Sequence, residues 1–219
     1  MAFNTGDNGY SVHAKGKITT KTASAFNEIF GDAEIVNPLR DFNGIVMPYN
    51  PLLNIQYDAN YSTQQPLHSN FQYPFYQNSQ FNSFSASFVL TSNTQKEARY
   101  TLACHHFLRT VTKMVQGGST NFSSSNRIGS PPPVLKFSAY GNEMFKDIPC
   151  VLTSYNFTME NDKIMINVTD EGGRKTDVYV PVEWTMIMQL QPAYNPKENR
   201  KKFNTADYAN GKLISGGYQ

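Results

Sequence analysis

The sequence is poor in charge, and it contains no long hydrophobic run. Only 16% of its 219 residues are Asp, Glu, Lys or Arg, and the formal net charge is +2. So small an excess of positive charge does not identify a nucleic-acid binder. The aromatic content of 13% also argues against a disordered chain, because disordered chains are short of aromatics. Polar residues follow Met1, so we expect neither a signal peptide nor a membrane anchor.

Cysteine is scarce as well. Cys104 and Cys150 have no companion Cys or His at the spacing of a zinc site. We expect both to be reduced thiols, although the sequence leaves a disulfide between them open. The chain therefore predicts no metal site built on cysteine.

Motifs of known catalytic chemistry are also missing. His105 and His106 are adjacent, so on a helix they point about 100° apart and do not chelate one metal together. Asp170 and Glu171 are neighbours in an expected hairpin turn and lack a third catalytic group. The glycine pairs and the serine run do not match phosphate-loop, dinucleotide or nucleophile-elbow spacings; these are Gly117-Gly118, Gly172-Gly173 and Ser123–Ser125. We predict no enzyme activity, no cofactor and no metal.

One strand and one helix stand out in the stretch from Phe84 to Ser119. Apolar residues alternate from Phe84 to Leu90, which is the period of a strand with one buried face. Thr94-Gln95-Lys96-Glu97 then reads as a capping box that opens a helix. Gly117-Gly118 ends it. The expected helix spans residues 95–116, with one apolar face made of Tyr100, Cys104, Phe107, Val111 and Met114.

Most of the remaining chain has the two-residue period of strands. Further strands are expected at Leu52–Tyr61, Val134–Tyr140, Met144–Ile148, Cys150–Met159, Ile164–Val168, Thr176–Pro181 and Glu183–Gln191. In the strand after Pro149, Val151, Thr153, Tyr155, Phe157 and Met159 should share one face. In the last strand, Trp184, Met186, Met188 and Leu190 should share one face. The fold class is therefore mainly β (α+β), with one packed helix.

The two ends of the chain lack this regular pattern. Residues 1–50 predict a partly extended N-terminal arm with a short helical possibility at Ala23–Phe30. Residues 51–191 form the β domain, and residues 192–219 form a C-terminal arm. The basic cluster at 197–202 is typical of a solvated patch.

Six residues are the candidates for structural and interface roles. Phe107, Val111 and Met114 should hold the helix to the sheet. Trp184, Met186 and Met188 should fill the core or a subunit interface. The aromatics Tyr57, Tyr61, Phe71, Tyr73, Phe75 and Tyr76 could stack sugars or bases, but aromatics more often pack cores or subunit interfaces.

Several further stretches carry a family resemblance. They are FLRTVTKM at 107–114, GSPPPVLKFSAYG at 129–141, IPCVL at 148–152 followed by SYNF at 154–157, VPV at 180–182, and NGKLISGGY at 210–218. Together they resemble proteins of the tail tube and baseplate hub (tube-initiator type) of contractile-tailed, myovirus-like bacteriophages. The resemblance covers residues 50–219, whereas the first 50 residues have no counterpart in that group.

The resemblance implies both a fold and a place in the virion. The fold would be a tail-tube-like antiparallel β-sandwich or flattened barrel with one packed helix and extended arms. Subunits would form a ring, in most relatives a homohexamer, around a lumen that passes DNA and the tape measure protein during genome ejection. Partners would include the adjacent tail tube, baseplate hub or wedge proteins, reached through the loop Ser119–Ser130 and the tail 192–219. Assembly would take place in the host cytoplasm.

Two rival functions remain open from the sequence. One is a β-sandwich receptor- or glycan-binding module of a tail fibre or baseplate, which would use the aromatics at 57–76. The other is a peptidoglycan-degrading baseplate enzyme, which would require a carboxylate pair in a cleft. The sequence offers no such pair, so we rank this rival last.

Overall fold

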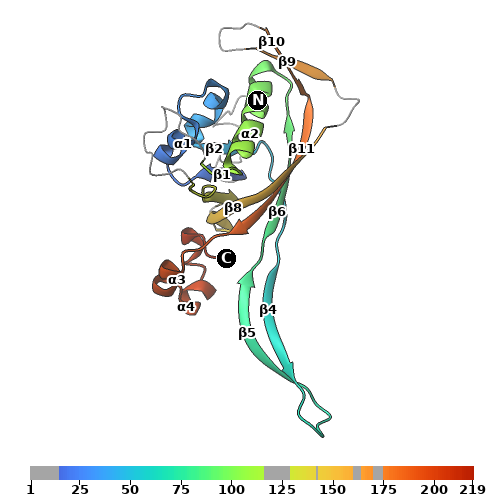
Figure 1. Ribbon diagram of the computed structural model, residues 1–219, viewed down its shortest axis with the longest axis vertical. Helices are drawn as coiled ribbons and strands as arrows, with labels where there is room; N and C mark the ends of the chain where they lie inside the picture. Colours follow the sequence, from blue (N-terminus) through green and yellow to red (C-terminus); the bar gives the residue numbers. More distant parts are fainter. Residues whose placement is uncertain (1–14, 116–128, 142, 160–163, 170–174) are drawn as a thin grey trace.

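The structure is a computed structural model, and it describes residues 15–115, 129–141, 143–159, 164–169 and 175–219 (Figure 1). The predicted glycine stop at 117–118, most of the loop predicted at 119–130 and the turn predicted at 170–173 lie outside these ranges. About 40% of the chain is strand and 28% is helical. The prediction of a mainly β fold with antiparallel pairing is confirmed.

A seven-stranded antiparallel sheet forms the body of the molecule. Its strands run in the order β2-β1-β7-β8-β11-β6-β3. Two further ladders, β4–β5 and β9–β10, have two strands each. The bounds of the sheet strands are β1 Lys17–Thr20, β2 Gly44–Val46, β3 Leu52–Asn54, β6 Phe84–Thr91, β7 Leu135–Ala139, β8 Phe145–Thr158 and β11 Glu183–Pro192; those of the hairpins are β4 Tyr57–Gln64, β5 Tyr73–Phe81, β9 Met165–Thr169 and β10 Lys175–Pro181.

The two central strands β6 and β11 follow the alternation that the sequence predicts. All eight positions of β6 pair with β11, and Trp184 stands opposite Leu90. Alternate side chains on both strands are buried, while those between them are partly or fully exposed. The predicted faces are confirmed; their buried members are Phe84, Ala86, Phe88, Leu90, Trp184, Met186, Met188 and Leu190.

The sheet curls around its core. The rings of Phe84 on β6 and Phe137 on β7 lie 5.2 Å apart, although β8 and β11 stand between these strands in the sheet. The edge strands β2 and β3 are also joined by only the short segment from Met47 to Pro51. A curled sheet of this kind encloses its apolar face more completely than a flat one, and this is how a single sheet encloses a core here.

The helix α2 (Gln95–Val111) lies against the apolar face of the sheet (Figure 1). Its capping box is present: the Thr94 hydroxyl accepts from the Glu97 amide at 3.3 Å, and the Glu97 carboxylate accepts from the Thr94 amide at 3.2 Å. The predicted start is confirmed. Within the helix, the Tyr100 hydroxyl donates to the Val46 carbonyl at 2.7 Å and accepts from the Val46 amide at 2.8 Å.

The end of α2 corrects the prediction. The helix stops at Val111 instead of 116, and Met114 lies beyond it with half of its surface exposed. The hydroxyls of Thr110 and Thr112 donate to the backbone carbonyls of His106 and Arg109, in the preceding turn. β-Branched residues that bond the preceding turn in this way weaken a helix. Met114 therefore does not hold the helix to the sheet.

The N-terminal residues from 15 onward belong to the sheet and its helical layer, which corrects the boundary predicted at residue 50. Strands β1 and β2 form one side of the sheet. Between them lie α1 (Ala23–Phe30) and a 3₁₀ segment, η2 (Glu34–Phe42). Four large apolar side chains of these elements are fully buried, namely Ile18, Phe26, Leu39 and Ile45. Strands β1 and β2 have only four and three residues, which is too few for an alternating pattern to identify them in the sequence.

The strand β8 is longer and less regular than the sequence predicts. It continues through Pro149, so the two predicted pieces are one strand. A register shift against β11 falls at Thr153, because Gln189 pairs with Ser154 and Leu190 pairs with Leu152. Such a bulge reverses which side chains face the core. Tyr155 and Phe157 therefore share the core side with Leu152, whereas Val151 and Thr153 do not, contrary to the prediction.

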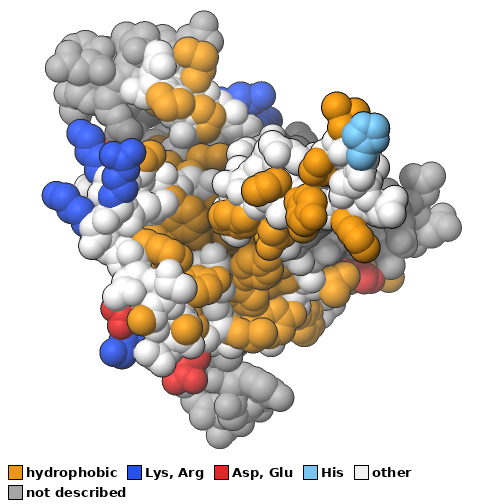
Figure 2. Space-filling model, turned by 90° about the horizontal axis from the view of Figure 1, so that it is seen from below, with side chains coloured by type: hydrophobic (Ala, Val, Ile, Leu, Met, Phe, Trp, Pro, Cys, Tyr) orange, Lys and Arg blue, Asp and Glu red, His pale blue; other side chains and the backbone are white. Residues whose placement is uncertain are grey.

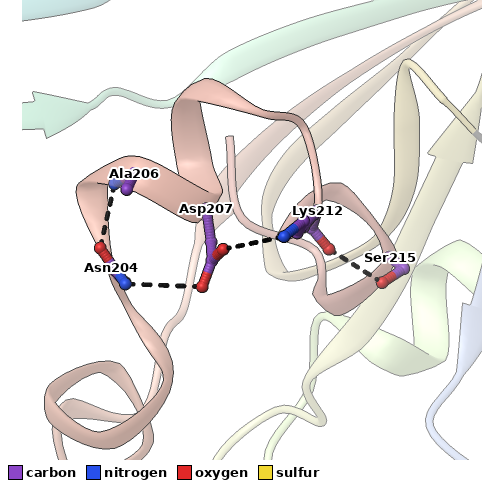
Figure 3. Close-up of polar contacts among 5 residues, drawn as sticks. All are labelled: Asn204, Ala206, Asp207, Lys212 and Ser215. Atoms are coloured by element: carbon purple, nitrogen blue, oxygen red, sulfur yellow. Dashed lines mark hydrogen bonds and ion pairs between the residues drawn. The ribbon is translucent and has the colours of Figure 1, made fainter.

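The C-terminal residues fold into short helices that pack back on the body. These are α3 (Pro196–Lys202), α4 (Thr205–Ala209) and a 3₁₀ turn, η4 (Ile214–Gly216). We call residues 193–219 the C-terminal unit. Local bonds hold it, including those of the Asp207 carboxylate to Asn204 and Lys212 (Figure 3). The Tyr194 hydroxyl donates to the Gly217 carbonyl at 2.8 Å. The expected extended tail is replaced by this compact unit.

Candidate assembly surface

The hairpin β4–β5 projects from the body far beyond the rest of the sheet (Figure 1). Most of its residues on both strands are exposed, and none is buried. Isolated two-stranded hairpins are marginally stable in water, because neither face is covered. Large exposed apolar side chains on a long hairpin, as found here among the described residues, are typical of a surface that binds a partner.

A ladder of aromatic rings connects the core to this hairpin. Phe84 in the core stacks on Phe81 with ring centroids 5.5 Å apart, and Phe81 stacks on Tyr57 at 5.0 Å. Further out, the rings of Tyr61 and Tyr76 meet edge to face at 5.7 Å. One face of the hairpin is therefore the continuation of the apolar face of the sheet, past the point where the helices cover it.

The C-terminal unit lies beside the end of this aromatic face that is nearest to the body of the molecule, at Tyr57. Burial, and to a smaller extent the neighbouring Tyr208, raise the pKa of the Tyr57 phenol above its usual value. Within the unit the rings of Phe203 and Tyr208 lie 5.6 Å apart. Seen from below, hydrophobic side chains gather across the middle of the molecule, between flanking charged groups (Figure 2).

We call this region the aromatic surface and define it by its exposed members. Each of them has between 40% and 59% of its surface exposed. Side chains of this type are enriched at the centres of protein interfaces. The members are Tyr57, Tyr61, Tyr76, Phe203 and Tyr208.

The opposite face of the hairpin is richer in amides. The Asn60 side chain donates to the Asn78 side chain at 2.8 Å, and Gln56 and Asn82 both donate to the Asp58 carboxylate. Two aromatic residues, Tyr73 and Phe75, are also exposed there. Asp58 is the only Asp, Glu, Lys or Arg between Tyr57 and Phe81. The hairpin thus offers apolar and neutral polar contacts with almost no charge.

The outer face of the sheet is mostly polar along its central strands, and Glu183, exposed at the start of β11, adds an acidic side chain. Figure 1 shows α1 and α2 on one side of the sheet, and the other side is open. The side chains there are mostly hydroxyls and amides; on the three central strands they include Ser85, Ser87, Thr185, Gln189, Ser154 and Asn156. Such a face presents few charges that could attract or repel a polyanion.

The six residues predicted for structural roles do not lie on the aromatic surface. Phe107 and Val111 are buried, and Phe107 stacks with Phe26 and Phe30 of α1 at 6.2 and 5.3 Å. Trp184, Met186 and Met188 are buried in the core, which decides between the two alternatives that the sequence left open. The hairpin aromatics were visible in the sequence, but their exposure was not. Phe203 and Tyr208 were missed, because isolated aromatics in a polar tail carry no period.

His105 packs in an aromatic cluster. Its ring lies 4.6 Å from the ring of Phe157 and 6.1 Å from that of Trp184. Burial lowers the pKa of the His105 imidazole, and the neighbouring His106 and Arg109 lower it further. Within the described part of the chain, no three His, Cys, Asp or Glu side chains are grouped so that they could hold a metal ion.

Both cysteines are free and buried. Burial raises the pKa of the Cys150 thiol to about 12 and also raises that of the Cys104 thiol. A protonated thiol is a poor nucleophile, so these side chains act as small apolar groups in the core.

Comparison with known proteins does not assign the chain to a family. No protein-family model matches the chain, and no curated protein matches it. No helix among the described residues is long and apolar enough to cross a membrane.

Proposed function

We propose that this protein is a structural component of a bacteriophage virion, one that self-assembles into a ring of the tail tube or baseplate hub. The observation that carries the proposal is the projecting hairpin, whose aromatic face continues the core and is left exposed by the part of the chain that the structure describes. Contact with a neighbouring copy would cover this face. The ring, expected to be six-fold, would surround a channel for DNA and the tape measure protein and would belong to the virion tail.

The amount of exposed aromatic surface suits this role. A fully buried aromatic side chain removes about 150–250 Å² from water. Five aromatics at about half exposure then offer on the order of 400–600 Å² to a partner, before the apolar parts of their neighbours are counted. A stable interface needs roughly 800 Å² from each partner. The aromatic surface supplies a large part of that area without help from charged pairs.

The open face of the sheet supports the channel part of the proposal. A lumen that passes DNA must not bind the phosphate backbone tightly, because contacts from Lys and Arg dominate affinity for DNA. The central strands carry mostly hydroxyls and amides on this face, with Glu183 as an acidic exception. We assign this face to the channel.

Electron microscopy of the purified full chain tests the proposal, with mass photometry alongside. Rings with a central hole are the expected result, while compact monomers at every concentration are the contrary one. Tyr61→Ser should weaken assembly by on the order of tenfold or more, because it removes a half-exposed ring from the aromatic face. Tyr73→Ser is the matched control, since Tyr73 is similarly exposed on the other face of the same hairpin.

A glycan- or receptor-binding module is the second candidate. The observation that favours it is the same row of exposed aromatic side chains on β4 and β5, since aromatic faces stack on sugars as well as on other proteins. This candidate predicts that a monomer or trimer binds carbohydrate on a glycan array and forms no rings. Assembly into rings, together with no binding to any glycan on the array, excludes this candidate.

A further inference from the structure

Two rings of the aromatic surface belong to the C-terminal unit and not to the sheet. Phe203 follows α3, and Tyr208 lies on α4. The structure describes both helices in full; they have seven and five residues, and neither contains a buried residue. Helices this short are marginal in water, and their own backbone bonds do not fix where they lie relative to the sheet. Another contact must therefore place Phe203 and Tyr208 beside Tyr57.

Tyr218 is the residue that joins these rings to the body. It is only 8% exposed, although it lies outside the core that the sheet and α2 enclose. Its ring stacks on that of Tyr194, with centroids 5.6 Å apart and the planes at 5° to each other. The ring of Phe203 lies 6.1 Å from that of Tyr218 and 5.6 Å from that of Tyr208. Aromatic pairs at such distances attract one another, so the rings form a continuous series from Tyr194 to Tyr208.

Tyr194, the first ring of this series, is itself fixed to the sheet. It comes soon after the end of β11, and the amide of its neighbour Ala193 donates to the Pro149 carbonyl of β8 at 2.8 Å. The Tyr194 hydroxyl donates to the Gly217 carbonyl, also at 2.8 Å. Tyr194 thus holds Tyr218 both through its ring and through the backbone of the preceding residue.

Residues 217–219, which we call the latch, fit closely against β8 and the turn before it. A Cβ at Gly217 would lie 2.5 Å from the Asp147 carbonyl oxygen, so the backbone of the latch packs directly on that of β8. The Gln219 side-chain amide donates to the Met144 carbonyl at 2.8 Å. The neighbouring turn η4 also packs on β8. The latch is therefore the part of the C-terminal unit that docks on the body.

A polar link also connects α4 to the chain that leads to the latch. The Lys212 ammonium lies 3.5 Å from the Asp207 carboxylate, and these side chains are 70% and 40% exposed (Figure 3). Exposed ion pairs contribute little to stability. The aromatic series, which is shielded from water at Tyr218, therefore has the larger effect on the position of α4.

We propose that Tyr218 is a positioning residue for assembly: it holds Phe203 and Tyr208 beside Tyr57, so that the chain presents its complete aromatic surface only while the latch is docked. The inference rests on the proposed function and adds a condition to it. When only a fraction of the molecules is competent to bind, the apparent affinity falls in proportion to that fraction. Changes at the latch therefore control assembly, although the latch lies outside the contact itself.

Tyr218→Ala tests the inference in the full chain. It removes the ring between Tyr194 and Phe203, so the docked fraction should fall and assembly should weaken by roughly tenfold or more. Tyr218→Phe is the matched control, because it keeps the stacked ring and should assemble like the natural sequence. Sedimentation velocity over a series of protein concentrations measures assembly. Equal assembly by Tyr218→Ala and the natural sequence would overturn the inference.

Two further measurements separate positioning from a general loss of stability. In Tyr218→Ala, hydrogen exchange should become faster in α3 and α4 and stay unchanged in β6 and β11. Urea unfolding followed by the fluorescence of Trp184, the only tryptophan, should keep its midpoint, because Trp184 lies in the core and Tyr218 does not. A lowered midpoint with faster exchange throughout the sheet would show that Tyr218 acts through the whole fold, against the inference.

A double-variant comparison identifies the rings through which Tyr218 acts. Phe203→Ser/Tyr208→Ser should weaken assembly by itself. Adding Tyr218→Ala to this variant should cause no further loss, because the rings that Tyr218 positions are already gone. Additive losses would contradict the inference, and so would undiminished assembly by Phe203→Ser/Tyr208→Ser.

The outcomes distinguish this inference from the proposed function. If the natural sequence forms rings and Tyr218→Ala forms them equally well, the inference fails and the proposed function stands. If the natural sequence forms no assembly at any concentration, the proposed function fails and the inference fails with it.

Discussion

At the scale of single residues, Phe107 joins α2 to the N-terminal helical layer. Its ring is fully buried and stacks with Phe26 and Phe30. Phe107→Ala should lower the free energy of unfolding by about 3–5 kcal/mol, since it leaves a cavity in a packed core. Met114→Ala, at a half-exposed position beyond the helix, should change it by less than about 1 kcal/mol. Urea denaturation of the two variants measures both; equal losses would contradict this account.

His105 should make stability depend on pH. Burial lowers the pKa of its imidazole in the folded state, and Arg109 and His106 add to this; the pKa of His106 is lowered too. The unfolded chain therefore binds protons more readily, so the stability that is present above about pH 6.5 decreases as the pH falls below it.

A double variant isolates this effect from other titrations. The difference in free energy of unfolding between pH 7.5 and pH 5.5, taken by urea denaturation, should be smaller for His105→Gln/His106→Gln than for the natural sequence. Carboxylates and other groups titrate equally in both proteins, so the comparison removes them. An unchanged difference would show that neither imidazole is linked to folding.

At the scale of elements, Gly217 should decide whether the C-terminal unit stays docked. Its φ is +79°, and a Cβ there would lie 2.5 Å from the Asp147 carbonyl oxygen. Gly217→Ala should therefore loosen the unit and speed hydrogen exchange and proteolysis within residues 193–219. Gly211→Ala is the matched control, because Gly211 also has a positive φ of +72° but meets only the end of the Ile214 side chain, at 3.5 Å. Equal protection in both variants would contradict the steric argument.

Long elements with one buried face could be predicted from the sequence, whereas short or interrupted ones could not. Strands β6 and β11 and the start of α2 follow directly from alternation and from the capping box at Thr94. The bulge at Thr153 reversed the face assignment of half a strand, because a pattern of period two contains no sign of an inserted residue. Strands β1 and β2 gain their place from tertiary pairing and not from their own pattern.

The candidate site was harder to predict for a related reason. Tyr57 and Tyr61 alternate with polar residues, which is the pattern of a half-buried strand, and the sequence gives no sign that the covering layer ends before the strand does. The inference that these aromatics serve an interface needs their exposure, which only the three-dimensional arrangement provides.

At the scale of the whole molecule, the aromatic surface predicts how assembly responds to salt. Its defining residues carry no charge, and the hairpin between Tyr57 and Phe81 has Asp58 as its only acidic or basic residue. Ion pairs between copies would be screened as the sodium chloride concentration rises from about 0.05 M to about 1 M. Apolar association should be nearly unchanged over this range, and sulfate should strengthen it, because excluded salts favour burial of apolar surface. Sedimentation velocity over both salt series measures the assembled fraction, and a steep loss in sodium chloride would show that charged groups, such as the basic cluster at 197–202, hold the copies together instead.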